Sequence, residues 1–338
     1  MNRKMTTIQM LVVLLVMALL LVACGTAVER EAVGTRSFGS QEANVEEVKF
    51  QSGGFRVVGD LRMPAGEGPH PAIIMVHGDG AATRNGAVQF GPMIEIFLRN
   101  GYSVFSWDKP GSGESTGQIS NAVTERAEIL ADGIAVLAEH PRIDPGRIGL
   151  WGISQAGWVM PLALELRDDV AFMIVVSGGA EDGIEQGAYM ISQQVLADGG
   201  TEEEAALVER YWAQQRKARD YDEYREAVEV LMGIPTVTSR YDLEITEEKR
   251  WKPVPRDWDM FIDPMDIIEH TTIPVLAIYG EKDAIIDPVQ GAEAYEAAFQ
   301  AAGNTNGQIV VLPNSAHVFT SHPEYQDTME TWLQHLSQ

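Results

Sequence analysis

The chain has 338 residues, of which 45% are hydrophobic, so it is long enough for one large domain or two small ones with full cores. Its 49 acidic residues outnumber its 25 lysines and arginines, which gives a formal net charge of −24. A surface of this sign repels phosphate backbones and anionic lipid headgroups. We therefore expect no nucleic-acid partner, and any membrane contact must come from an apolar or covalent anchor.

The chain begins with the features of a bacterial export signal. Arg3 and Lys4 form a short basic region, and residues 10–23 are an unbroken apolar run, shorter than the roughly 20 residues that span a bilayer. The run ends in the sequence LVAC, which resembles a bacterial lipobox. The resemblance implies that residues 1–23 are a lipoprotein signal peptide and that Cys24 is acylated. We expect an extracytoplasmic protein, lipid-anchored to a bacterial membrane; the alternative is an uncleaved signal anchor.

The next segments alternate between strands and helices. Residues 24–44 are polar, small and aperiodic, which predicts a flexible tether. Residues 45–63 have the pattern of two antiparallel strands joined at a Ser-Gly-Gly turn. Six further strands are predicted at residues 71–76, 102–107, 147–151, 171–176, 273–279 and 308–312. Helices are predicted at residues 90–99, 122–139, 155–166, 289–302 and 325–336.

Short strands that are apolar on both faces and alternate with helices indicate a parallel sheet covered on both sides. The predicted fold class is therefore α/β, with a doubly wound, mostly parallel eight-stranded sheet built from residues 45–180 and 270–338. The alternation breaks in residues 181–269, where Thr201 and Glu204 predict a helix-capping box. We interpret this segment as a helical cap inserted between strands 6 and 7, rather than as a plain surface insertion. We expect the cap to set substrate choice and to take no part in the chemistry.

A serine follows one of the predicted strands, at the edge of the sheet where sites of this architecture lie. Ser154 stands in the sequence GISQAG, between strand 147–151 and the helix that follows it. A serine on such a sharp turn is exposed above the sheet, with the positive end of a helix beneath it. The usual pattern is G-x-S-x-G, and this chain has Ala156 at the last position, followed by Gly157.

An acid and a histidine follow two later strands, so that Ser154, Asp283 and His317 occur in the order of an α/β-hydrolase triad. His317 would take the hydroxyl proton, and Asp283 would orient the imidazole and stabilise its charged form. Asp287 on the same loop is the alternative acid, and Glu281 is the third choice.

The sequence His-Gly-Asp-Gly after strand 71–76 resembles an H-G-x-G oxyanion loop. The backbone N–H groups of Asp79 and Gln155 would then bind the oxyanion. We expect His77 to hold this loop in place, not to act as a base, and Asp108 to order the loop after strand 102–107.

The segments HGDG, DKPGSGES, GISQAG, GEKD and NSAH together resemble the α/β-hydrolase superfamily across residues 45–338. The closest likeness is to bacterial EstD-type carboxylesterases and to hydrolases related to prolyl oligopeptidase. This resemblance implies hydrolysis of an ester, thioester or amide through an acyl-enzyme, without a metal or organic cofactor.

Three functions remain open. The first is a serine esterase that cleaves the carboxylic ester of a small molecule. The second is a serine peptidase, because an acidic cap can receive a peptide amine. The third is a non-catalytic surface lipoprotein that has kept the fold, which an intact triad argues against. A serine in place of aspartate at the strand-to-helix turn excludes dehalogenases and epoxide hydrolases.

Overall fold

The computed structural model describes residues 44–86 and 90–336. The expected signal peptide, Cys24 and all of the tether except its last residue lie outside the described residues. No helix in the described part of the chain is both long and apolar enough to cross a membrane.

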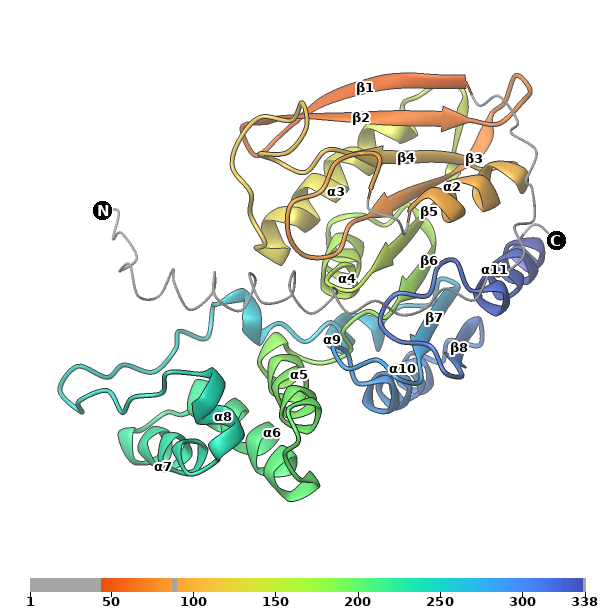
Figure 1. The fold of residues 1–338 in the computed structure, drawn as a ribbon. Helices are drawn as coiled ribbons and strands as arrows, with labels where there is room; N and C mark the ends of the chain where they lie inside the picture. Colours follow the sequence, from red (N-terminus) through yellow and green to blue (C-terminus); the bar gives the residue numbers. More distant parts are fainter. Residues whose placement is uncertain (1–43, 87–89, 337–338) are drawn as a thin grey trace. The chain divides into compact units, whose positions relative to one another are not determined.

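Eight strands form one sheet in the order β1-β2-β4-β3-β5-β6-β7-β8 (Figure 1). Strands β1, β2 and β4 pair antiparallel, and every later pairing is parallel. The strands are β1 (Asn44–Ser52), β2 (Phe55–Met63), β3 (His70–Val76), β4 (Ser103–Trp107), β5 (Ile143–Ile153), β6 (Val170–Val176), β7 (Val275–Gly280) and β8 (Gly307–Leu312). The predicted fold class is confirmed.

Helices cover both faces of the sheet because the central strands are apolar on both sides. Ile74 and Val76 of β3 belong to one apolar core, and Ile73 and Met75 belong to the other. The first core also contains side chains of α3 (Val123–Ala138), α4 (Ala156–Leu166) and α10 (Pro288–Ala302). The second contains side chains of α2 (Phe90–Arg99) and α11 (Pro323–Leu336).

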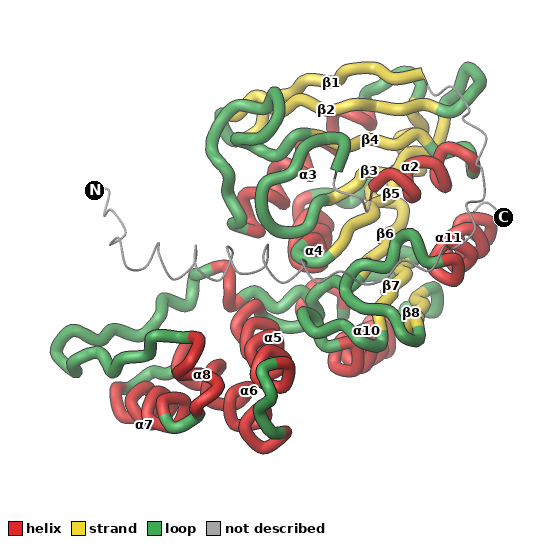
Figure 2. The backbone as a smooth tube through the Cα atoms, viewed as in Figure 1, coloured by secondary structure: helices red, strands yellow, loops and turns green. Residues whose placement is uncertain are grey.

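The cap follows β6 and ends before β7, as the sequence predicts. Its helices are α5 (Gly183–Ala197), α6 (Glu202–Lys217), α7 (Tyr221–Met232), α8 (Pro235–Arg240), η1 (Asp259–Phe261) and α9 (Met265–Ile268). Thr201 and Glu204 form the predicted capping box at the start of α6. Residues 241–258 contain neither helix nor strand, and they form the long loop after α8 in Figure 2.

Helix α5 was not among the predicted helices. Asp182 caps it by accepting hydrogen bonds from the backbone N–H groups of Ile184 and Glu185. Gly183 and Gly187 lower the intrinsic helix propensity of this segment. The helix forms nonetheless, because Ile184, Ala188 and Ile191 are buried in the two small apolar clusters of the cap.

Candidate active site

Ser154 lies on the sharp turn between β5 and α4. Its φ is 59°, a left-handed conformation that is strained for a residue with a Cβ. The turn is held by hydrogen bonds from the Ser154 N–H to the Val176 carbonyl (3.0 Å) and from the Gly157 N–H to the Ser154 carbonyl (2.9 Å). Strain of this kind persists where neighbouring structure enforces it, and it concentrates at functional sites.

Small residues on either side of the turn allow this conformation. A Cβ on Gly152 would clash with the Ala156 side chain, so Gly152 leaves the room that the alanine occupies. A Cβ on Gly157 would lie 2.6 Å from the backbone nitrogen of Gly179, so this glycine lets α4 approach the segment that follows β6. The departure from the G-x-S-x-G pattern is therefore accommodated, because Gly157 makes the close approach.

His317 and Asp283 are brought together at the carboxyl ends of the strands. Nδ1 of His317 lies 2.8 Å from Oδ2 of Asp283, whose side chain is fully buried. The other carboxylate oxygen accepts the backbone N–H groups of Ile285 (2.8 Å) and Ile286 (3.1 Å). An Nδ1–H that donates to a carboxylate leaves Nε2 with a free lone pair, which a general base requires.

The two alternative acids have other partners. Asp287 is the N-cap of α10, where it accepts the backbone N–H groups of Val289 and Gln290. Glu281 accepts the backbone N–H of Asn314 at 2.8 Å. Neither carboxylate is hydrogen-bonded to His317 among the described residues.

Ser154 Oγ and His317 Nε2 are not hydrogen-bonded to each other in the described part of the chain. In enzymes without bound substrate such bonds are often long, and they tighten when the substrate binds. The structure therefore shows the acid–base half of the expected triad in contact and the serine, partly accessible, on its turn.

The expected oxyanion loop lies against the serine. A Cβ on Gly78 would be 3.3 Å from Cβ of Ser154 and 3.8 Å from its Oγ. Among the described residues, no acceptor takes a hydrogen bond from the backbone N–H of Asp79 or of Gln155. Both groups are thus available to a ligand, which an oxyanion hole requires.

His77 is buried in this loop and has the surroundings of a structural residue. Its Nε2 lies 3.1 Å from the Thr83 carbonyl, and its ring packs against Phe90 and Trp107. Burial, with a smaller contribution from the Lys109 cation, lowers the pKa of His77 to about 3. The imidazole is therefore neutral at physiological pH, as expected for a residue that holds the loop.

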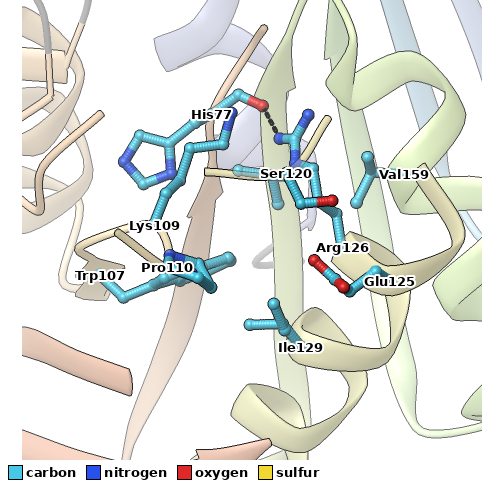
Figure 3. Close-up of a pocket in the computed structure, with 10 residues that line it drawn as sticks. His77, Trp107, Lys109, Pro110, Ser120, Glu125, Arg126, Ile129 and Val159 are labelled. Atoms are coloured by element: carbon cyan, nitrogen blue, oxygen red, sulfur yellow. Dashed lines mark hydrogen bonds between the residues drawn. The ribbon is translucent and has the colours of Figure 1, made fainter. Parts of the chain in front are cut away.

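Two buried cations, Lys109 and Arg126, lie behind the loop, and neither was predicted from the sequence as part of the site. The Lys109 ammonium donates to the carbonyls of Gly78 (2.8 Å) and Gly80 (2.6 Å). Figure 3 shows the Arg126 guanidinium reaching the His77 carbonyl. A small cavity of about 10 Å³ is lined by both cations (Figure 3). The sequence does carry a signal for Arg126: it is a charged residue on the apolar face of a helix, and in the structure it shares the buried face of α3 with Ala127 and Leu130.

Two side chains of α5 reach the loop that carries Asp283. The Tyr189 hydroxyl donates to the Asp283 carbonyl at 2.8 Å, and the Gln186 amide donates to the Ile285 carbonyl at the same distance. No local sequence pattern predicts these contacts, because they join residues more than 90 positions apart.

Glu181 is a half-buried carboxyl group shortly after β6. Burial, reinforced by Glu185 and then by Asp287 and Asp182, raises the pKa of Glu181 to about 8. Its backbone carbonyl accepts a hydrogen bond from the Trp158 indole (2.8 Å). Trp158 belongs to α4, the helix that follows Ser154, so this bond ties the backbone at Glu181 to that helix.

The strand order, the serine on the turn between β5 and α4, and the histidine–aspartate pair together define an α/β hydrolase. The protein is a hydrolase of this type. More narrowly, the chain belongs to the X-Pro dipeptidyl-peptidase (S15) family, whose model matches residues 53–318.

Similar proteins include a thiohydrolase, a peptidase and an esterase. The thiohydrolase aneE of Aspergillus aculeatus is 34% identical over 121 residues, which are 35% of this chain and 36% of that protein. The uncharacterized peptidase YtmA of Bacillus subtilis is 24% identical over 245 residues, 72% of this chain and 75% of that one. A solved Pyrococcus furiosus esterase superposes with a TM-score of 0.58 at 17% identity, covering 89% of this chain and 96% of that structure, and shows the shared fold alone.

Proposed function

We propose that this protein is a serine esterase that cleaves the carboxylic ester of a small molecule through an acyl-enzyme. Ser154 is the nucleophile, His317 the general base and Asp283 the acid that orients it. The observation that carries the proposal is the 2.8 Å contact between His317 Nδ1 and the buried Asp283 carboxylate, on the sheet edge that also presents the strained Ser154.

The reaction follows from these positions. Ser154 Oγ attacks the ester carbonyl carbon while His317 Nε2 takes the hydroxyl proton. The carbonyl oxygen becomes an oxyanion that accepts the N–H groups of Asp79 and Gln155. The C–O bond to the alcohol then breaks, and the alcohol leaves with the proton from His317. Water repeats the sequence on the acyl-enzyme and releases the acid.

A panel of p-nitrophenyl esters of increasing acyl length, measured beside aminoacyl anilides, tests this function. We expect turnover of the esters and stoichiometric labelling by a fluorophosphonate that is lost in Ser154→Ala. A chain that neither turned over any ester nor took up the label would be a non-catalytic protein that has kept the fold.

Amide hydrolysis is the second candidate, and Glu181 is the observation that favours it. The family is named for a peptidase, and a peptide amine needs an anionic partner. Glu181 is protonated in the free site because its pKa is raised to about 8, and an incoming ammonium group would lower that pKa and ionise the carboxyl. Cleavage of aminoacyl anilides that is lost in Glu181→Gln, with acetate-ester turnover retained, would favour the peptidase.

We further propose that an N-terminal lipid on Cys24 holds the enzyme on the outside of a bacterial membrane. The support is the sequence of the export signal alone. Such an anchor would keep a strongly acidic domain at a membrane that its own surface does not attract.

A further inference from the structure

Lys109 and Arg126 are buried cations without a direct carboxylate partner among the described residues: Glu125 lines the same small cavity, but its buried Oε1 accepts no hydrogen bond from them. Their exposed fractions are 3% and 6%, and neither forms an ion pair with a described carboxylate. Their hydrogen-bond partners are uncharged oxygens. Burying an uncompensated cation costs several kcal/mol, and neutral donors could hold the same carbonyls at a smaller cost. This position for two cations therefore calls for a functional explanation.

The first part of that explanation is the direction of one peptide group. Lys109 holds the Gly78 carbonyl at 2.8 Å, and the peptide bond between Gly78 and Asp79 is trans. In a planar trans peptide the C=O and N–H point in opposite directions. The Asp79 N–H therefore points away from Lys109. The second bond, to the Gly80 carbonyl at 2.6 Å, fixes the loop on the other side of Asp79.

The second part is a bridge between the two expected oxyanion donors. Arg126 donates to the His77 carbonyl, next to the loop, and also to the side chain of Gln155, whose N–H is the other donor. The Gln155 amide in turn donates to the Asn121 carbonyl, at 3.3 Å. One guanidinium thus sets the spacing between two segments that are far apart in the sequence.

We propose that Lys109 and Arg126 are positioning residues of the oxyanion hole, which aim the N–H groups of Asp79 and Gln155 at the oxygen that becomes negative on Ser154. The inference rests on the proposed function, because it requires an oxyanion on this serine. Neither side chain is placed in contact with the substrate. Both act through the backbone that they hold.

The charge of Lys109 gives it a second effect. Burial and, next, the Arg126 cation lower the pKa of Lys109 to about 7, while the exposed Asp79 carboxylate acts in the opposite direction. Its ammonium form is therefore poorly stabilised in the free enzyme. A negative oxyanion on the far side of the loop would stabilise the ammonium form of Lys109. Because this coupling is reciprocal, the ammonium form stabilises the oxyanion by the same free energy. Stabilisation that is stronger in the transition state than in the free enzyme accelerates the reaction.

The test uses the variant Lys109→Met in the full chain, with phenyl acetate and its thionoester as substrates. The sulfur of a thionoester accepts hydrogen bonds poorly, so the rate ratio of ester to thionoester reports on the oxyanion donors. Because it is a ratio, it does not change if part of the sample is unfolded. We expect kcat on the ester to fall about 10- to 100-fold with KM within about 2-fold, and the ratio to fall at least 5-fold.

Arg62→Met is the matched control. Arg62 is a largely buried cation of β2 that donates to Asp60 and Ser106 and does not touch the oxyanion loop. We expect its melting temperature to change and its ester-to-thionoester ratio to stay at the wild-type value. If Lys109→Met does not fold, Lys109→Gln is measured in its place, because glutamine keeps a hydrogen-bond donor and loses the charge. We expect a lowered ester-to-thionoester rate ratio in that variant too.

The outcomes separate this inference from the function on which it rests. Ester turnover that survives Ser154→Ala would overturn both. Loss of turnover in Ser154→Ala, with full kcat in the Lys109 variant, would overturn the positioning role alone. A Lys109 variant with lowered kcat and an unchanged ratio would also overturn it, because a merely structural residue gives that result.

Discussion

The Tyr189 hydroxyl donates a hydrogen bond of 2.8 Å to the backbone carbonyl of Asp283, so a helix of the cap touches the residue that orients the proposed base. The Gln186 amide makes the neighbouring contact with the Ile285 carbonyl. The contact gives α5 a structural role beside the substrate choice expected of the cap, and the expectation that the cap takes no part in the chemistry stays a prediction. This helix supports the loop that holds the acid.

Replacing Tyr189 by Phe should lower kcat roughly 3- to 10-fold on a small acetate ester, since one hydrogen bond contributes about 1 kcal/mol. KM should change little, because the lost bond holds the acid loop rather than the substrate. Tyr211→Phe on α6 is the control, since its hydroxyl bonds no described residue. Equal activity in the two variants would mean that the α5 contact does not affect the acid.

Ser154→Ala and His317→Ala should each reduce kcat by about 10³-fold or more, because triad members act as a unit. The circular-dichroism spectrum should be unchanged in both variants. Steady-state turnover of p-nitrophenyl acetate, after titration of active sites, measures the effect. Near-wild-type turnover in either single variant would remove that residue from the mechanism.

Asp283→Asn should reduce kcat far more than Asp287→Asn. An amide at position 283 no longer fixes the imidazole tautomer, which in a related arrangement costs about 10⁴-fold. Asn caps a helix about as well as Asp does, so Asp287→Asn should change stability by less than about 1 kcal/mol. The measurement is kcat beside a thermal melt for both variants. The reverse ranking would make Asp287 the acid and leave Ser154 and His317 in place.

Cys24→Ser should release the protein from membranes or block its processing. The reason is the apolar run of residues 10–23, which is too short to span and ends in LVAC. Cell fractionation with mass spectrometry of the mature chain measures both effects. If fractionation and mass were the same as in wild type, the run would be an uncleaved signal anchor.

The elements that the sequence predicts are those whose pattern is local. The strand before Ser154 is predicted by an apolar run, and the helix after it by a glycine and a change in the spacing of the apolar residues. The structure places both elements within a few residues of the expected bounds. The proposed acid and base could be named because each follows a separate strand. Asp283 could not be preferred over Asp287 with the same force, since the helix-capping role of the latter appears only in the structure.

The contacts that the sequence could not predict join distant segments. Lys109 holds carbonyls about 30 positions earlier in the chain, and Tyr189 reaches a carbonyl 94 positions later. The sequence around Lys109 is rich in glycine and serine, which is typical of an exposed loop, so it predicts a solvated lysine. Only the packing of the loops after β3 and β4 shows that it is buried.

The left-handed backbone at Ser154 implies that this enzyme is less stable than its fold allows. A residue with a Cβ in that conformation costs about 1–2 kcal/mol, and glycine carries almost none of this cost. Ser154→Gly should therefore melt a few degrees above Ser154→Ala, although both are inactive. Thermal stability alone would favour glycine at this position, so the chain carries its proposed nucleophile at the expense of some stability.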